Sequence, residues 1–376
     1  MLYKNKIKIK YHMTTENIEI NLEQAQDIAT QLMDNSRTIG LELECFIEES
    51  QFQSFIDDCN NHPLLTIEAQ GYNHQTRSYW KIIGDGSLGN RNRAMRGIEI
   101  VSPPLRASHL FEELNALLEI LNSYNSEVNK TCGLHCHHSL DGFKAKQLQY
   151  LVNHFVKNES AIDTILAESR RGNQESVRGF KACQSNKALL TRMIRQDAVR
   201  NRADGQGSVN GVSRYTKLNL QSYSRYGTCE FRGHQGTLDF TKIVAWVALT
   251  QNLVLKSKTK VKQTNIKYNN NMFNLLLSTG WATRDGKRLR AKSLACHYLC
   301  QYIIERQLHF GFDKVAPTLL EYEVPMTSNN KKIIATQAMV KIRNLIIERY
   351  SNTQGNEIGI CLDDDKIRSL VAELNL

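Results

Sequence analysis

The chain of 376 residues has no long, uninterrupted hydrophobic run. Its longest apolar stretch, residues 243–255, is broken by the polar residues 250–252, and it is too short and too polar to span a membrane. Residues 1–6 lack the apolar core of a secretory signal. The nine cysteines are an odd number without the spacing of a disulfide framework, which favours a reducing compartment. We therefore expect a cytoplasmic protein with no membrane association.

Motifs of the common nucleotide-binding folds are also absent. The chain has no Walker motif and no dinucleotide fingerprint, since Gly84-x-Gly86 is too short to count as one. It has no internal repeat and no low-complexity tract. The hydrophobic content of 41% and the charged content of 23% are those of an ordinary globular protein. Any chemistry must therefore be sought in other motifs.

Basic residues exceed acidic ones, and the excess is uneven. The net charge of +10 favours acidic partners such as nucleotides, nucleic acids or acidic peptides. Residues 170–214 hold ten Lys or Arg residues but only three acids. This segment is either a solvated basic face or a region that closes over phosphate. Phe180 is its only aromatic residue, so stacking platforms are few and nucleic-acid binding is an alternative that is not favoured.

Three strings place charged or imidazole side chains at every second residue of a β-prone run. They are Gly-Leu-Glu-Leu-Glu at 40–44, Gly-Leu-His-Cys-His-His-Ser-Leu at 133–140, and Thr-Cys-Glu-Phe-Arg-Gly-His-Gln-Gly-Thr-Leu-Asp at 228–239. Side chains alternate between the two faces of a strand. Each string should therefore aim its polar residues at one face, as pairs: Glu42 with Glu44, His135 with His137, and Glu230 with Arg232. Such a surface suggests an ion-holding site.

Strand and helix patterns alternate along the chain and set the fold class. We expect strands at 38–49, 79–83, 97–101, over 133–140 and around Glu230, and helices at about 21–33, 110–121 and 144–169. From about residue 241 the pattern is mostly helical. Strands of alternating polarity fit an antiparallel sheet with helices on its back and an open polar face. The prediction is an α+β fold with an extension (1–36), a main domain (37–250) and a helical carboxyl-terminal region (251–376).

Carboxylates gathered on one sheet face repel one another, so burying them together requires positive charge. The candidate ligands are four glutamates and one histidine: Glu42, Glu44, Glu99, Glu230 and His135. Oxygen-rich clusters suit the hard cations Mg²⁺ and Mn²⁺. Because Mg²⁺ keeps waters and takes substrate phosphates as further ligands, the cluster points to a nucleotide. Arg232 would then face an anionic group beside the metal ions.

The strings also have plainer interpretations. The first alone fits a solvent-facing strand edge, and the histidines alone fit a structural role. A zinc-stabilised interaction module would combine the histidines with Cys132 and Cys136. These two cysteines lie on the face opposite His135 and His137, however, so one tetrahedral site is awkward.

Together, the motifs resemble those of the amidoligases of the glutamine synthetase and glutamate–cysteine ligase superfamily. To the strings at 40–44 and 228–239 they add Gly-Asp-Gly-Ser-Leu at 84–88, Gly-Ile-Glu-Ile-Val-Ser-Pro at 97–103, Cys-Gly-Leu-His-Cys-His at 132–137 and Ser-Arg-Arg at 169–171. The order and spacing match over about residues 38–250. The resemblance implies a glutamine synthetase-like catalytic domain at 37–250, and it says nothing about residues 1–36 and little beyond 255.

The resemblance implies an ATP-dependent carboxylate–amine ligase. ATP would phosphorylate a substrate carboxylate, and an amine would attack the acyl-phosphate to leave an amide or peptide bond. Both substrates would be small molecules or peptides. The chain lacks the ammonium-site loop of glutamine synthetase, so a peptide or a polyamine fits as well as ammonia. A phosphotransferase on the same fold is the alternative enzyme, and the oligomeric state is open.

The resemblance also assigns roles to residues. The implied metal ligands are Glu42, Glu44, Glu99, His135 and Glu230. His135 would also touch nucleotide phosphate with His137 nearby, and Arg171 and Arg214 are further candidates for nucleotide binding. The catalytic candidates are Arg232, which the resemblance implies would hold a carboxylate or phosphate, Glu99, and Asp85, which lies in a family motif and which we interpret as amine binder or base.

Overall fold

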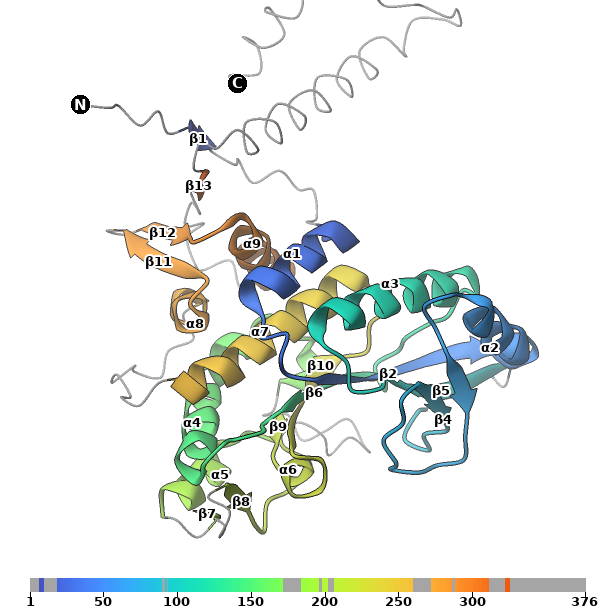
Figure 1. The fold of residues 1–376 in the computed structure, drawn as a ribbon, viewed down its shortest axis with the longest axis horizontal. Helices are drawn as coiled ribbons and strands as arrows, with labels where there is room; N and C mark the ends of the chain where they lie inside the picture. The colour runs from blue at the N-terminus through green and yellow to red at the C-terminus, as the bar shows by residue number, and fades with distance from the viewer. Residues whose placement is uncertain are drawn as a thin grey trace, which may run out of the picture. The chain divides into compact units, whose positions relative to one another are not determined.

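The computed structural model describes residues 7–9, 19–89, 92, 94–171, 184–195, 198–201, 206–259, 272–285, 288–310 and 322–324. The chain divides into two compact units. One comprises Met1–Lys10 and Tyr322–Leu376, in which strands β1 (Ile7–Ile9) and β13 (Tyr322–Val324) pair antiparallel. The other, Tyr11–Glu321, contains the predicted sheet and its helices (Figure 1).

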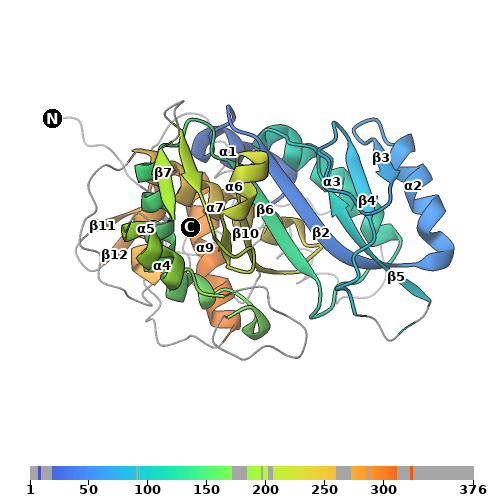
Figure 2. The same cartoon turned by 90° about the horizontal axis from the view of Figure 1, so that it is seen from below.

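A seven-stranded sheet organises the larger unit, in the order β3-β4-β5-β2-β6-β10-β9. Its strands are β2 (Ile39–Glu48), β3 (Ile67–Ala69), β4 (Trp80–Ile83), β5 (Met95–Val101), β6 (Gly133–Ser139), β9 (Leu218–Asn219) and β10 (Thr228–Gln235). The pairs are antiparallel, as predicted, except that the short β3 runs parallel to β4. Figure 2 shows β2 and β6 running side by side through the middle of the sheet.

The register brings the polar residues of separate strings together. Glu42 lies opposite His135, Glu44 lies opposite Glu99, and Glu230 lies opposite His137. Because pairing at these positions matches the alternation of side chains, all of these residues point to the same face. The predicted polar face is therefore present in the sheet.

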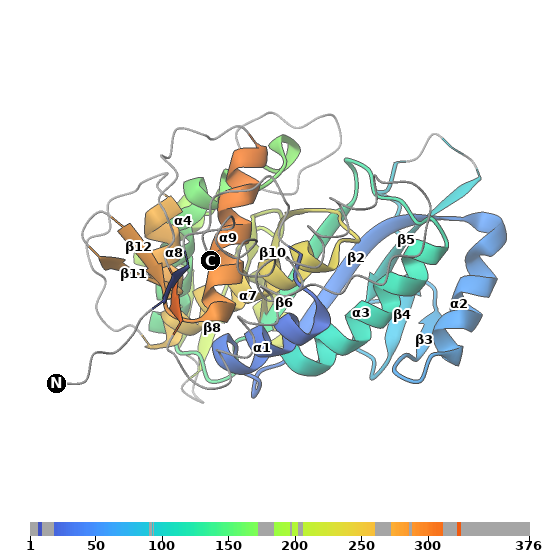
Figure 3. The ribbon, with the colours of Figure 1, turned by 90° about the horizontal axis from the view of Figure 1, so that it is seen from above.

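The opposite face is apolar and covered by helices. Three of them, α1 (Leu22–Leu32), α3 (Ala107–Ser123) and α7 (Phe240–Thr259), lie over the sheet in Figure 3, and α4 (Ala145–Asp163) packs against α7. Asn21 caps α1 by accepting a hydrogen bond from the Gln24 amide, and Phe155 of α4 packs edge-on against Phe231 of β10. Burial of this face against the helices forms the core of the larger unit.

The remaining elements flank this core. A 3-10 turn (Glu49–Gln51) leads into α2 (Phe52–Asn61), and α5 (Lys187–Ile194), β7 (Val199–Asn201), β8 (Gly207–Val209) and α6 (Gln221–Tyr226) precede β10. The later region is helical at α8 (Met272–Thr279) and α9 (Leu294–His309) but also contains a hairpin of β11 (Ala282–Asp285) and β12 (Arg288–Ala291). The boundary predicted at residue 250 falls inside α7. In the described part of the chain, no helix is long and apolar enough to cross a membrane.

Candidate functional site

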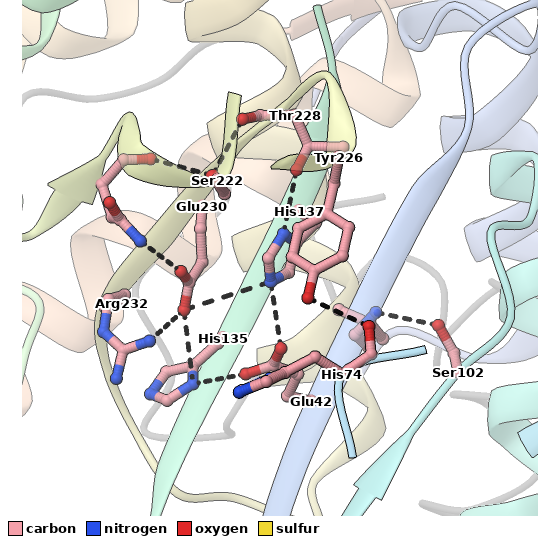
Figure 4. A network of polar contacts seen from close by, with 12 residues as sticks. Glu42, His74, Ser102, His135, His137, Ser222, Tyr226, Thr228, Glu230 and Arg232 are labelled. Carbon is pink, nitrogen blue, oxygen red and sulfur yellow. Dashed lines mark hydrogen bonds and ion pairs between the residues drawn. The ribbon is translucent and has the colours of Figure 1, made fainter. Parts of the chain in front are cut away.

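The polar face gathers carboxylates, imidazoles and a guanidinium from four neighbouring strands. Strand β2 supplies Glu42 and Glu44, β5 supplies Glu99, β6 supplies two histidines, and β10 supplies Glu230 and Arg232. Glu44, Glu99 and Glu230 are almost fully buried. Buried charges at this density require compensating partners. Figure 4 shows how the central members of the group lie.

Glu42 holds both histidines. One of its carboxylate oxygens lies 2.9 Å from Nδ1 of His135, and the other lies 3.1 Å from Nε2 of His137. The opposite ring nitrogen of His137 lies 3.1 Å from the Thr228 hydroxyl, which fixes the orientation of the ring. Glu230 approaches the same imidazoles at 3.6 and 4.0 Å. Glu42, His137 and Glu230 each offer one ligand atom within 4.8 Å of the others, as a metal site requires.

Glu42, His137 and Glu230 form the first metal-capable group, and their contacts shift the pKa values of two of its members. Burial alone would raise the pKa of Glu42, but its hydrogen bonds with His135 and His137 hold that pKa well below the usual value. Burial alone would lower the pKa of His137, but the hydrogen bond with Glu42 and the charge of Glu230 raise it. The group therefore holds an ionised carboxylate against a histidine that retains its proton more strongly than usual.

A second group lies beside the first. Glu44, Asp85 and Glu99 each offer a carboxylate oxygen, and these oxygens lie within 4.8 Å of one another. Asp85 comes from the Gly84–Gly86 turn, where its side chain accepts a hydrogen bond of 2.7 Å from the Ser87 amide. The Nε2 atom of His135 lies 3.9 Å from Glu44. Since His135 also contacts Glu42, its ring stands between the two groups.

The second group is short of positive charge. Burial raises the pKa of Glu99 well above the usual value, and the charges of Glu42, Glu44 and Asp85 raise it further. Glu44 is better compensated, because it accepts a hydrogen bond of 2.6 Å from the Gly133 amide. Three carboxylates that crowd together in this way suit a hard divalent cation such as Mg²⁺ or Mn²⁺.

Arg232 lies at the β10 side of the face. Its guanidinium forms an ion pair with Glu230, whose other oxygen accepts a hydrogen bond of 2.6 Å from the Asn219 side chain. Burial alone would lower the pKa of Arg232, but the charges of Glu230 and Glu42 raise it further above its already high value. Arg232 is therefore a cation beside both metal-capable groups, and its role toward a bound anion stays a prediction.

Lys81 also lies on the polar face, although the sequence alone does not point to it. It belongs to β4, it is buried, and its register partner on β5 is Val101, two residues from Glu99. Burial lowers its pKa, while the charges of Glu99 and Glu42 oppose that change. Its signal in the sequence is weak, because the Trp-Lys-Ile-Ile run of β4 is otherwise apolar.

The two arginines predicted to bind nucleotide have their described contacts elsewhere. Arg171 donates to the Leu166 carbonyl at 2.8 Å and lies 4.9 Å from the centre of the Phe310 ring. Arg214 is exposed beside the Tyr215 ring. Of the basic segment between residues 170 and 214, positions 172–183, 196–197 and 202–205 fall outside the described residues. A nucleotide-binding role for either arginine stays a prediction.

The cysteines and histidines of the 132–138 string separate onto the two sheet faces. Cys136 and His138 point to the apolar side, where the His138 ring bonds with the Thr250 hydroxyl of α7 at 2.7 Å. Burial lowers the pKa of His138 to about 3 and raises the pKa of the Cys136 thiol. Neither Cys136 nor His138 lies on the sheet face of His135, so the string does not form one tetrahedral zinc site.

Comparisons with known proteins agree with the motifs. Residues 20–254, more than half of the chain, match the protein-family model described as "Putative amidoligase enzyme". A search of curated protein sequences gives no match. One similar solved structure is a Plasmodium falciparum glutamine synthetase, with 15% identity and a TM-score of 0.33 over 63% of this chain and 55% of that one. Another is a glutamine synthase homolog, with 10% identity and a TM-score of 0.35 over 78% of this chain and 70% of that one.

These solved structures are distant. The chain spans about half the length of the Plasmodium falciparum protein. At such TM-scores, the similarity to these solved structures supports no conclusion about function. The family match does not depend on it, because it covers β2 to β10 and the strings on which the resemblance was based. The α+β fold and the family resemblance are thus confirmed, and the chain belongs to the amidoligase family.

Proposed function

We propose that the chain is an ATP-dependent carboxylate–amine ligase that forms an amide or peptide bond through an acyl-phosphate. One observation carries the proposal: two metal-capable groups lie side by side on one sheet face, His135 stands between them, and Arg232 flanks them. Proteins catalyse phosphoryl transfer mainly by positioning the reactants and by compensating negative charge.

The donor set fits Mg²⁺ or Mn²⁺. Carboxylate oxygens and an imidazole are ligands that these ions accept, and the crowding that raises the pKa of Glu99 would be relieved by a cation. When bound, such ions would offset the negative charge of the nucleotide phosphates and of the carboxylates. The proposed ligands of the first ion are Glu42, His137 and Glu230, and those of the second are Glu44, Asp85 and Glu99. His135, which lies between the two groups, is a further candidate ligand for either ion.

The remaining roles follow from position. Arg232 would hold the substrate carboxylate or the transferring phosphoryl group, because it is a largely buried, permanently charged guanidinium beside both groups. The attacking amine must lose a proton as the C–N bond forms and phosphate leaves. Glu99 and Asp85 keep their predicted catalytic roles, Asp85 as amine binder or base, because both carboxylates lie in the second group.

A product screen tests the proposal. Purified protein would be incubated with ATP, Mg²⁺ and paired panels of carboxylates and amines, with new amides detected by mass and with ADP and phosphate measured separately. A ligase yields one amide, one ADP and one phosphate per turnover. ADP without free phosphate would indicate the phosphotransferase instead. The matched control is Glu44→Gln, which removes one candidate ligand charge but can still accept the hydrogen bond from Gly133.

A further inference from the structure

The two carboxylate oxygens of Glu230 have different partners. One oxygen pairs with the Arg232 guanidinium and lies 3.6 Å from the His135 ring and 4.0 Å from the His137 ring (Figure 4). The other oxygen accepts a hydrogen bond of 2.6 Å from the side-chain amide of Asn219. Glu230 therefore turns one oxygen toward the first metal-capable group, while Asn219 occupies the other oxygen.

The orientation of the Asn219 amide is fixed by a second contact. Its carbonyl oxygen accepts a hydrogen bond of 2.8 Å from the backbone amide of Gln221, the first residue of α6. A backbone N–H can only donate, so the NH₂ group of Asn219 must be the end that points to Glu230. Asn219 and Glu230 are both buried, so this contact is not exposed to bulk solvent.

Strand β9, which carries Asn219, is only two residues long, yet buried polar groups anchor it. The Lys217 ammonium donates to both carboxylate oxygens of Asp163 on α4, at 2.7 and 2.8 Å. The Asn186 side chain donates to the Leu218 carbonyl at 2.7 Å and accepts from the Leu218 amide at 3.0 Å. These contacts hold the two residues that precede Asn219, so its side chain has a rigid support.

The second metal-capable group shows the same division of oxygens. One oxygen of Glu44 accepts a hydrogen bond of 2.6 Å from the Gly133 amide, and one oxygen of Asp85 accepts a hydrogen bond of 2.7 Å from the Ser87 amide. The donors in this group are backbone amides, which substitution does not remove. Asn219 is a side-chain donor, so its contribution can be tested by substitution.

A carboxylate with one oxygen occupied in this way is prepared to ligate a cation through the other. The positive end of the N–H dipole repels a cation from the occupied oxygen, and partners of this kind orient metal ligands and contribute to metal affinity. Mg²⁺ requires near-octahedral geometry, whereas Ca²⁺ takes more oxygens and often both oxygens of one carboxylate. Carboxylates that offer one oxygen each therefore suit the smaller ion.

We propose that Asn219 is a positioning residue that holds Glu230 as a one-oxygen ligand in the first group, and thereby favours Mg²⁺ or Mn²⁺ over Ca²⁺ there. The inference rests on the divalent sites of the proposed function. Without the Asn219 amide, the second oxygen of Glu230 is free to ligate, which suits Ca²⁺. The effect should be confined to the first group, because the donors to Glu44 and Asp85 belong to the backbone.

A metal titration tests the proposal without any need for turnover. Binding of Mn²⁺ would be measured from the electron paramagnetic resonance signal of the free ion, and Mg²⁺ and Ca²⁺ would be measured by competition with Mn²⁺. In Asn219→Leu, which keeps a side chain of similar size without the amide, we expect one of two Mn²⁺ sites to weaken about tenfold or more. The other site should bind as in the wild type. At the weakened site, the affinity for Ca²⁺ should fall less than the affinity for Mg²⁺.

Two further variants separate positioning from folding. Asn219→Ser keeps an acceptor for the Gln221 amide, but its hydroxyl is one bond shorter than the amide that reaches Glu230. It should therefore show the same loss at one site. Asn252→Leu is the matched control, because it removes a buried amide of α7 that donates to the Leu32 carbonyl at 3.2 Å. It should leave both Mn²⁺ sites unchanged.

The outcomes separate the positioning role from the ligase. Loss at one site in both Asn219 variants, in a protein that releases no ADP in the product screen, would sustain the positioning role and refute the ligase. Unchanged Mn²⁺ binding by the Asn219 variants of a protein that forms an amide would do the reverse. Equal weakening of both sites, or equal losses for Mg²⁺ and Ca²⁺, would mark Asn219 as structural and overturn the proposal. Wild-type protein that binds fewer than two Mn²⁺ ions would overturn it together with the two-ion arrangement of the proposed function.

Discussion

Glu44 and Glu99 lie directly opposite each other on β2 and β5, so two buried carboxylates share one register position of the sheet. Cross-strand pairs of like charge are normally destabilising. The Gly133 amide donates a hydrogen bond that stabilises the Glu44 carboxylate. Burial and the repulsion from neighbouring carboxylates instead raise the pKa of Glu99. A sheet position that is unfavourable in the metal-free protein is a position where a bound cation contributes most to stability.

The first prediction concerns the pH dependence of this strain. Because the pKa of Glu99 is higher in the folded than in the unfolded protein, the folded state binds an extra proton between the two values. The contribution of Glu99 to the free energy of unfolding therefore falls as pH rises through that window. In chelator, Glu99→Gln should match the wild-type melting temperature near pH 4 and exceed it at pH 7 to 8, as scanning calorimetry would measure. A wild type that stays ahead at every pH would contradict the raised pKa.

Metal addition should reverse this order. With saturating Mg²⁺, the wild type should gain melting temperature at pH 7 to 8 while Glu99→Gln gains less, because the amide offers no negative charge to the cation. The binding should also release protons, which is detected by titrating in buffers of different ionisation enthalpy. Equal gains in the two proteins would remove Glu99 from the set of ligands.

The second prediction separates Glu44 from Glu230. Glu230→Ala removes the ion pair between a buried carboxylate and the largely buried Arg232 guanidinium, which should cost about 3 kcal/mol of metal-free stability. Glu44→Gln keeps an acceptor for Gly133 and removes a repelling charge, so its metal-free stability should be unchanged or higher. Both variants should lose turnover. Denaturant unfolding in chelator measures the stabilities, and a Glu230→Ala variant as stable as Glu44→Gln would show that the ion pair contributes little.

Residues that share a strand were predictable from sequence. Glu42 with Glu44 and His135 with His137 follow from the two-residue period of a strand, which no tertiary contact can change. That the strands are neighbours, with His135 beside Glu42, depends on the order of strands in the sheet, which the pattern within each string does not specify. Helix α1 was predicted to within a residue, since its cap and periodicity are local signals.

Residues placed by loops were not predictable in this way. Asp85 joins Glu44 and Glu99 because a turn carries it there, and Lys81 sits in a run whose other members are apolar. The hydrogen bond from Tyr226 to His74 joins residues 152 positions apart, and no pattern in either segment predicts it. Such contacts arise from packing of the whole chain, so periodicity could not reveal them.

The third prediction is that Arg232 and His135 fail differently. Arg232→Ala should lower the turnover rate by about a hundredfold or more, because a buried donor beside the reacting groups is lost, and Arg232→Lys should not restore it, since a point charge cannot reproduce the two-pronged guanidinium. His135→Ala should instead raise the Mg²⁺ and ATP concentrations required, because its ring contacts Glu42 and approaches Glu44. Turnover measured against each ligand decides, and near-normal activity of Arg232→Lys would contradict the assignment.

The last prediction is that Lys81 holds residues 70–78, the strap that connects β3 to β4, in place. Lys81→Met keeps the length and apolar stem of the side chain but removes the ammonium that binds the Asn73 and Gln75 carbonyls. Each lost hydrogen bond contributes about 1 kcal/mol, so amide hydrogen exchange in the strap should accelerate by about tenfold or more, while exchange in the neighbouring β2 stays unchanged. Lys146→Met, at an exposed lysine of α4, is the matched control and should leave the strap protected. Unchanged exchange in Lys81→Met would mean that the bond from Tyr226 to His74 is sufficient to fix the strap, whereas acceleration that spreads through β2 would mark Lys81 as a residue of the sheet core instead of an anchor of the strap.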